Sequence, residues 1–132
     1  MTEFVEVKTA QLEGAALDWA VAQVEKVQTT YRYGRELVAD HDRGGIKLIL
    51  SIRPIYSPST NWSQGGPLIQ KYGCDLNCMA PLNAWEANCW DDRVPSPGLH
   101  LQEAETPLIA ACRAIVSAKI GDTVQVPKEL LA

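Results

Sequence analysis

The sequence predicts one α+β domain, residues 1–132, in which a small, mostly antiparallel sheet packs against two main helices. Short segments near both ends of the chain alternate apolar and polar residues, as half-buried strands do. Two longer segments have the apolar spacing of helices. The 132 residues are 46% hydrophobic and 21% charged, which is typical of a single globular domain.

A strand and the first main helix are predicted at the start of the chain. Residues 4–8, FVEVK, alternate apolar and polar side chains, and residues 12–27 then change to helical spacing. The apolar stripe of this helix contains Ala16, Trp19, Ala20, Val24 and Val27. We expect Trp19 in the core, because the charged or polar residues lie largely off that stripe: Asp18, Gln23, Glu25 and Lys26.

A hairpin and a buried strand are predicted next. Gly44 and Gly45 accept positive φ without steric cost, which favours a turn over residues 42–45. Residues 46–52, IKLILSI, are almost continuously apolar, so we expect a central, mostly buried strand here. Pro54 ends this strand because proline has no N–H to donate to a neighbouring strand.

The second half of the chain is predicted to hold a short helix and two strands. Pro67 suits the first position of a helix over residues 67–72, and Gly73 suits its end. Strands are then plausible near residues 74–79 and 84–90.

The second main helix has clear signals at both ends. Thr106 suits the N-cap, Pro107 the first turn and Gly121 the stop, which predicts a helix over residues 107–120. Residues 123–126, TVQV, are expected to form a closing strand. The apolar face of the helix comprises Leu108, Ala111, Cys112, Ile115, Val116 and Ile120.

Charge and composition restrict the partners and the compartment. A net charge of −4 and a pI near 5.1 oppose binding to nucleic acid. The acidic N-terminal segment does not resemble a signal peptide, and no stretch approaches the roughly 18 apolar residues of a membrane span. We therefore expect a cytoplasmic protein whose four cysteines are reduced.

Motifs for metal binding or catalysis are weak. Cys112 falls mid-helix, and the other three cysteines lack the paired short spacing of zinc sites. His41 and His100 lie in separate loops with no recognisable nucleophile motif. We predict no metal, cofactor or catalytic residue, and interpret the loop aspartates as solvated turn residues: Asp40, Asp42, Asp91 and Asp92.

The loop over residues 56–67 is the strongest candidate for a binding site. Its glycines would permit close backbone approach, the following helix N-terminus would favour negative charge, and Tyr56 or Trp62 could stack on a base. An alternative is a well-ordered connection in which Trp62 fills a gap in the core. Trp85 and Trp90 could likewise complete an aromatic pocket or fill the core. The predicted ligand-binding residues are Arg53, Tyr56, Ser57, Ser59, Thr60, Trp62, Gly65, Gly66 and Trp85.

Four segments in sequence order resemble the NinX-like family of small tailed-phage proteins: LEGAALDWAVAQVE, YSPSTNWSQGGPLIQKYG, WEA at 85–87 and TPLIAACRAIVSAKIGDTVQVP. The resemblance covers roughly half of the chain and departs from the family pattern in residues 28–45 and between Gly73 and Thr106. It implies a phage or prophage accessory protein acting in the cytoplasm of an infected or lysogenic bacterium. It supplies no catalytic residues.

Three functions follow as hypotheses. The first is a counter-defence protein, or sponge, that sequesters a small nucleotide-derived signal of bacterial immunity without catalysis. The alternative is a protein-interaction module acting in recombination, replication or defence, whose acidic surface meets a basic partner. The third is an enzyme that cleaves a nucleotide signal with His41 or His100 and a nearby carboxylate. Because such pockets often lie at subunit interfaces, we also expect a homodimer or higher oligomer.

Overall fold

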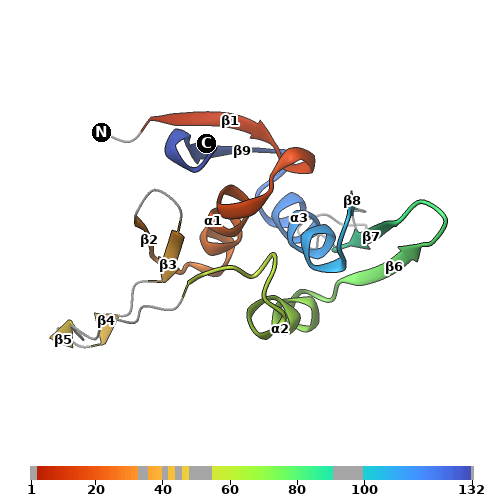
Figure 1. Cartoon of the computed structure of the whole chain (residues 1–132), viewed down its shortest axis with the longest axis horizontal. Coiled ribbons are helices and arrows are strands. Elements are labelled where there is room, and N and C mark those ends of the chain that lie inside the picture. The colour runs from red at the N-terminus through yellow and green to blue at the C-terminus, as the bar shows by residue number, and fades with distance from the viewer. Residues whose placement is uncertain are drawn as a thin grey trace.

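The computed structural model describes residues 3–32, 36–39, 42–43, 46–47, 55–90 and 100–131. Near the centre of the molecule, α1 (Gly14–Glu25) packs against α3 (Pro107–Lys119), and α2 (Trp62–Tyr72) lies against α3 from below (Figure 1). Short 3-10 helices follow the first and last strands: η1 (Thr9–Gln11) and η2 (Lys128–Leu131). The predicted α+β class, with two main helices and a shorter one between them, is confirmed.

The strands of the described residues form small antiparallel sheets rather than one larger sheet. β1 (Phe4–Lys8) pairs with β9 (Thr123–Pro127) along one side of the molecule. A three-stranded sheet at the other side has the order β6 (Asp75–Met79), β7 (Ala84–Asn88) and β8 (Leu101–Ala104). Two hairpins complete the set: β2 (Thr29–Arg32) with β3 (Glu36–Ala39), and β4 (Asp42–Arg43) with β5 (Ile46–Lys47).

The predicted hairpin near residues 42–45 is supported by the pairing of Arg43 with Ile46. The predicted strand over residues 46–52 is described only at Ile46–Lys47, which form β5. Residues 44–45, where the turn is predicted, and residues 48–52 lie outside the described residues, so the central position predicted for this strand stays a prediction.

The core is built around α3, which packs against the two other helices and the three-stranded sheet. Nine of its thirteen residues are buried, including Ala110 and Ser117 outside the predicted apolar face. The prediction for Ile120 was wrong. Its side chain is 39% exposed, because the helix ends at Lys119 and Ile120 lies beyond the last turn.

The structure of α1 differs from the sequence prediction at Asp18 and adds detail at Trp19. Asp18, predicted to lie off the buried stripe, is only 5% exposed. Trp19 is partly buried against the core, and its ring lies 6.2 Å from that of Phe4, centroid to centroid.

The short helix begins five residues earlier than predicted. Asn61 serves as its N-cap, because its side-chain Oδ1 accepts a 2.9 Å hydrogen bond from the Ser63 N–H. Gly65 and Gly66 are therefore helical residues, and Pro67 lies inside the helix instead of starting it. The predicted end is confirmed, since Gly73 adopts a left-handed conformation with φ 63°.

Candidate functional site

The segment that enters α2 is anchored to α1 by a buried hydrogen bond. The backbone N–H of Ser59 donates to Asp18 Oδ1 at 2.8 Å, and the two residues are 1% and 5% exposed. Burial raises the pKa of Asp18 from 3.8 to about 6, because water no longer solvates its charge. The nearby Ser59 hydroxyl and N–H lower this pKa in part. The Ser59 hydroxyl lies outside hydrogen-bonding geometry and has no partner among the described residues.

Gln64 fixes the same segment from the other side. Its Oε1 accepts a 2.6 Å hydrogen bond from the Ser57 N–H, and its Nε2 donates to the Ile55 carbonyl at 2.7 Å. The amide of Gly65 donates to the Asn61 carbonyl at 2.8 Å, within the first turn of the helix. These bonds hold the segment in one conformation.

Gly65 brings this segment against α3. A Cβ atom at this position would lie 2.1 Å from the Pro58 carbonyl oxygen and 2.8 Å from Leu108 Cδ2. Only glycine fits such an approach without a shift of its neighbours. Gly65 and Ser59, both predicted to contact a ligand, therefore face the interior.

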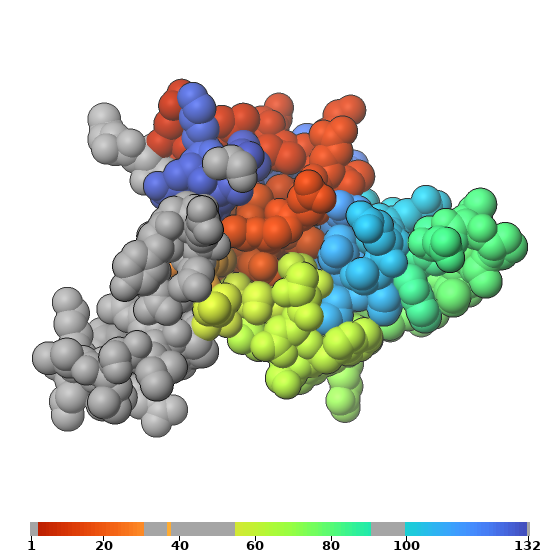
Figure 2. Space-filling view, viewed as in Figure 1, coloured from red at the N-terminus to blue at the C-terminus, as the bar shows by residue number. Residues whose placement is uncertain are grey.

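The opposite side of the segment faces outward. Thr60, Asn61, Trp62 and Ser63 are all exposed, and 55% of the Trp62 side chain is accessible. In Figure 2 the yellow to green segment that contains them forms part of the surface beside α1 and α3. Trp62 does not fill a gap in the core, so that part of the alternative is wrong, whereas the segment is a well-ordered connection. Gly66 lies beneath it, since a Cβ there would meet Trp62 Cε3 at 3.7 Å.

The remaining predicted ligand residues are more dispersed. Tyr56 is partly buried against the core, and its N–H donates to the Leu37 carbonyl at 2.7 Å. Burial, with smaller contributions from Glu25 and Asp18, raises the pKa of its hydroxyl. Trp85, on β7, also packs against the core. Arg53 lies outside the described residues.

A family model described as "Bacteriophage P22, NinX" matches residues 8–119 of the chain. The chain belongs to this NinX family of phage proteins. The match extends from the end of β1 to the end of α3 and includes Asp18, Ser59, Gly65 and Trp62. Comparison with the curated proteins gives no match. No helix within the described ranges is both long and apolar enough to cross a membrane.

A series of hydrogen-bonded polar side chains lies at the C-terminal end of α3 in this NinX protein, and the sequence alone did not predict it. His100 Nδ1 lies 2.9 Å from Ser117 Oγ, and the Ser117 hydroxyl donates to Asp122 Oδ1 at 3.4 Å. When the Ser117 hydroxyl donates to Asp122, the tautomer of His100 that carries a proton on Nδ1 donates to Ser117. His100 is therefore joined to a carboxylate only through a serine.

This arrangement does not form a nucleophile for an external substrate. Ser117 is 1% exposed, and in a catalytic triad the histidine, not the serine, lies between the other two groups. The backbone N–H of His100 donates to Asn88 Oδ1 at 2.9 Å, so the cluster joins β7, β8 and α3. His41 lies outside the described residues.

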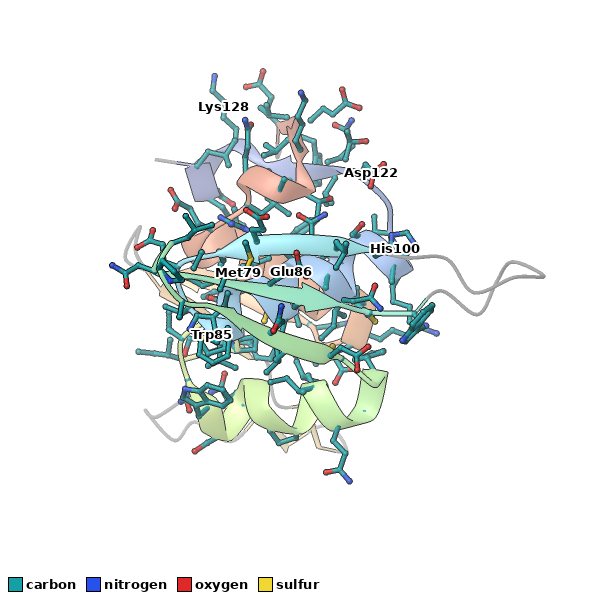
Figure 3. The ribbon with its side chains drawn as sticks, turned by 90° about the vertical axis from the view of Figure 1, so that its right-hand side faces the viewer. Met79, Trp85, Glu86, His100, Asp122 and Lys128 are labelled. Atoms are coloured by element: carbon teal, nitrogen blue, oxygen red, sulfur yellow. The ribbon has the colours of Figure 1, made fainter. Side chains whose placement is uncertain are left out.

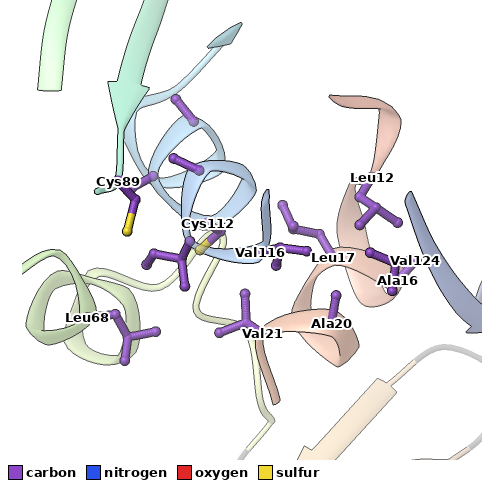
Figure 4. Packing of buried hydrophobic residues seen from close by; sticks show 14 of the residues in the cluster. Leu12, Ala16, Leu17, Ala20, Val21, Leu68, Cys89, Cys112, Val116 and Val124 are labelled. Atoms are coloured by element: carbon purple, nitrogen blue, oxygen red, sulfur yellow. The ribbon is translucent and has the colours of Figure 1, made fainter. Parts of the chain in front are cut away.

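In this NinX protein, the spatial arrangement of the cysteines differs from their order in the sequence. Cys89 and Cys112 are buried in the same part of the core, and their side chains are seen together in Figure 4. Cys74 lies beside Cys89, and their hydrogen bond raises the pKa of the Cys74 thiol, whereas Cys78 is exposed. Within the part of the chain that the structure describes, no three histidine, cysteine or carboxylate side chains form a group that could hold a metal.

Proposed function

We propose that this phage accessory protein binds and sequesters a small nucleotide-derived signalling molecule without catalysing a reaction. The observation that carries the proposal is the exposed indole of Trp62 at the first residue of an eleven-residue helix. An aromatic ring at that position offers a stacking surface for a base beside a site that favours a negatively charged group.

The first turn of α2 suits an anionic ligand electrostatically. It contains no acidic residue, so the partial positive charge of the helix N-terminus is not neutralised locally. The exposed Thr60 and Ser63 add hydroxyl groups that can donate to phosphate or ribose oxygens. In this proposal Arg53 supplies a positive charge to the phosphate.

The inward-facing residues have a supporting role in this proposal. Asp18, Gln64 and Gly65 fix the segment before any ligand arrives. A loop that is already ordered loses little conformational entropy on binding, which increases affinity. Ser59 thus contributes through its backbone bond to Asp18 and not by touching the ligand.

The test is binding of cyclic nucleotides and ADP-ribose derivatives, measured by titration calorimetry and by native mass spectrometry. Stacking contributes roughly 1–3 kcal/mol per base, so Trp62→Ala should weaken binding roughly 5- to 150-fold. Trp90→Ala is the matched control, because Trp90 is also exposed, at 46%. The bound molecule should be recovered chemically intact, and the native mass also reports whether the protein is an oligomer. Equal affinity of Trp62→Ala and wild type would refute the site.

A second candidate function, binding to a basic protein, is favoured by the outer face of the three-stranded sheet. Leu76, Trp85 and Ala104 pack toward the core, so side chains at alternate positions face outward. Glu86 and Glu103 stand directly opposite each other on that outer face, which Figure 3 views from the front. Opposed like charges destabilise a sheet, and a cationic partner would relieve the repulsion.

The two functions are distinguished by charge reversal on the sheet. The double variant that carries both Glu86→Lys and Glu103→Lys should lose salt-dependent binding of a basic protein partner and should bind nucleotides as the wild type does. Trp62→Ala should have the opposite pattern. Loss of protein binding in Trp62→Ala alone would reject the acidic sheet face as the protein-binding surface.

A further inference from the structure

Cys74 and Cys89 occupy opposing positions at the end of a strand pair. β6 and β7 are antiparallel, and their last pair at this end is Asp75 with Asn88. Continuing the same register by one residue on each strand sets Cys74 opposite Cys89. Opposing residues in an antiparallel pair have Cα atoms about 4.5–5.5 Å apart, which lies inside the roughly 4.4–6.8 Å range of disulfides.

The two thiol groups interact in the reduced protein. Cys74 and Cys89 share a side-chain hydrogen bond, and Cys89 Sγ lies 3.5 Å from the Tyr72 carbonyl oxygen at the end of α2. The Cys74 N–H donates to the Ile69 carbonyl at 2.9 Å, which fixes Cys74 directly after the helix. Cys74 is partly exposed, whereas Cys89 is completely buried.

We propose that Cys74 and Cys89 form a redox-convertible pair that closes to an intramolecular disulfide under oxidising conditions and joins the end of α2 to the end of β7. In the reduced protein the same two thiols are part of the core. The proposal concerns the stability and redox state of the fold, and it is independent of the proposed ligand.

A peroxide supplies the oxidising equivalents. Cys74 loses its proton, the thiolate attacks one peroxide oxygen and the O–O bond breaks, which leaves a sulfenic acid on Cys74 and a hydroxide ion. The hydroxide takes up the proton released by Cys74 and becomes the first water. Cys89 sulfur then attacks the Cys74 sulfur, the S–O bond breaks, and the hydroxyl leaves as a second water with the Cys89 proton. The two thiols lose two electrons and two protons, and the peroxide is reduced to two waters.

The surroundings make this a slow switch. The hydrogen bond with Cys89 and partial burial raise the pKa of the Cys74 thiol, so little thiolate is present at neutral pH. The reaction should therefore accelerate as the pH rises. Cys112 is the competing partner for Cys89, since both are buried in the same part of the core, and Cys78 is the exposed competitor for the oxidant.

The experiment treats the folded full-length protein with hydrogen peroxide, blocks remaining thiols and maps linked peptides without reduction. The Cys78→Ser variant is measured beside wild type, because Cys78 is exposed and its loss should leave the fold intact. Both proteins should show a Cys74–Cys89 link, a loss of two free thiols and a raised melting temperature, all reversed by a reductant. Cys74→Ser should show none of these changes.

Three results would overturn the proposal. They are a Cys89–Cys112 link in place of Cys74–Cys89, oxidation confined to Cys78, and four free thiols after prolonged treatment of the wild type at pH 8. Circular dichroism before treatment shows that each variant is folded, so that a missing link cannot be attributed to misfolding.

Discussion

Asp18 Oδ1 accepts a 2.8 Å hydrogen bond from the backbone N–H of Ser59, 41 residues further along the chain. This bond joins LEGAALDWAVAQVE to YSPSTNWSQGGPLIQKYG, two of the segments that resemble the NinX family. Gly65 then presses the second segment against Leu108, in a third such segment, TPLIAACRAIVSAKIGDTVQVP. The inward-facing residues of the loop, Ser59 and Gly65, therefore contact the other helices, and its outward-facing residues, such as Trp62, are available for binding.

Ionised Asp18 should cost stability at neutral pH. Its folded-state pKa, about 6, lies above its ordinary 3.8, so the folded state holds this proton more tightly than the unfolded state. The resulting stabilisation is fully present below pH 3.8 and is lost as the pH rises through 6. This difference between the folded-state and ordinary pKa of Asp18 corresponds to roughly 3 kcal/mol of folding stability.

Asp18→Asn tests this prediction. Asparagine keeps an oxygen that accepts from the Ser59 N–H but carries no charge. Urea unfolding should show that the variant gains stability relative to wild type at pH 8 and that the gain disappears near pH 4. Asp18→Ala is the control, because it leaves the buried N–H unpaired and should lose roughly 1–3 kcal/mol at pH 4. An equal difference between Asp18→Asn and wild type at both pH values would contradict the assignment.

Gly65→Ala and Gly66→Ala should have opposite effects, although the two glycines are adjacent in one helix. The added methyl group at Gly65 would collide with the Pro58 carbonyl and Leu108, which should lower stability by roughly 1–3 kcal/mol or more. The methyl group at Gly66 finds ordinary contact distances and should raise stability by roughly 0.4–1 kcal/mol. Chemical denaturation measures both. Equal destabilisation would show that Gly65 does not make the close approach.

Trp62→Ala should leave the stability of the fold nearly unchanged. Its side chain is 55% exposed, whereas Trp85 is partly buried against the core. Trp85→Ala should therefore cost roughly 2–4 kcal/mol, while Trp62→Ala should remain within about 1 kcal/mol of wild type. Differential scanning calorimetry distinguishes them. A large loss of stability in Trp62→Ala would mean that Trp62 is a core residue.

Glu86→Lys should stabilise the three-stranded sheet. The substitution converts the opposed Glu86 and Glu103 into an oppositely charged pair, a change of roughly 0.2–1 kcal/mol. Adding Glu103→Lys restores two like charges and should remove the gain. Urea unfolding of the single and double variants at low salt measures the coupling. A gain that persists in the double variant would show that the two side chains do not interact.

Local signals predicted the ends of the second main helix well. Thr106 Oγ1 accepts from the Ile109 N–H at 3.2 Å, and Pro107 occupies the first turn, as their positions in the sequence indicated. The strands predicted at residues 4–8 and 123–126 are found at Phe4–Lys8 and Thr123–Pro127, because alternation along a strand is a local pattern. Such features depend on neighbouring residues alone.

The predictions that failed depend on distant contacts. Nothing within α1 itself indicates that Asp18 is buried, because its partner Ser59 comes from a later segment. Gly65 and Gly66 favoured a loop by propensity, yet they form helix because α2 packs closely against Leu108. The Asn61 cap was a readable signal for the true start, but the glycine pair after it obscured it.

The pairing of β1 with β9 sets the timing of folding during synthesis. Residues 4–8 leave the ribosome more than a hundred residues before their partners, residues 123–127, are made. At about 5–20 residues per second, the first strand waits roughly ten seconds for its partner. For most of that interval α1 also lacks α3, which packs against it in the finished protein. The nascent chain would therefore present apolar surface to chaperones and proteases until both α3 and β9 have been made.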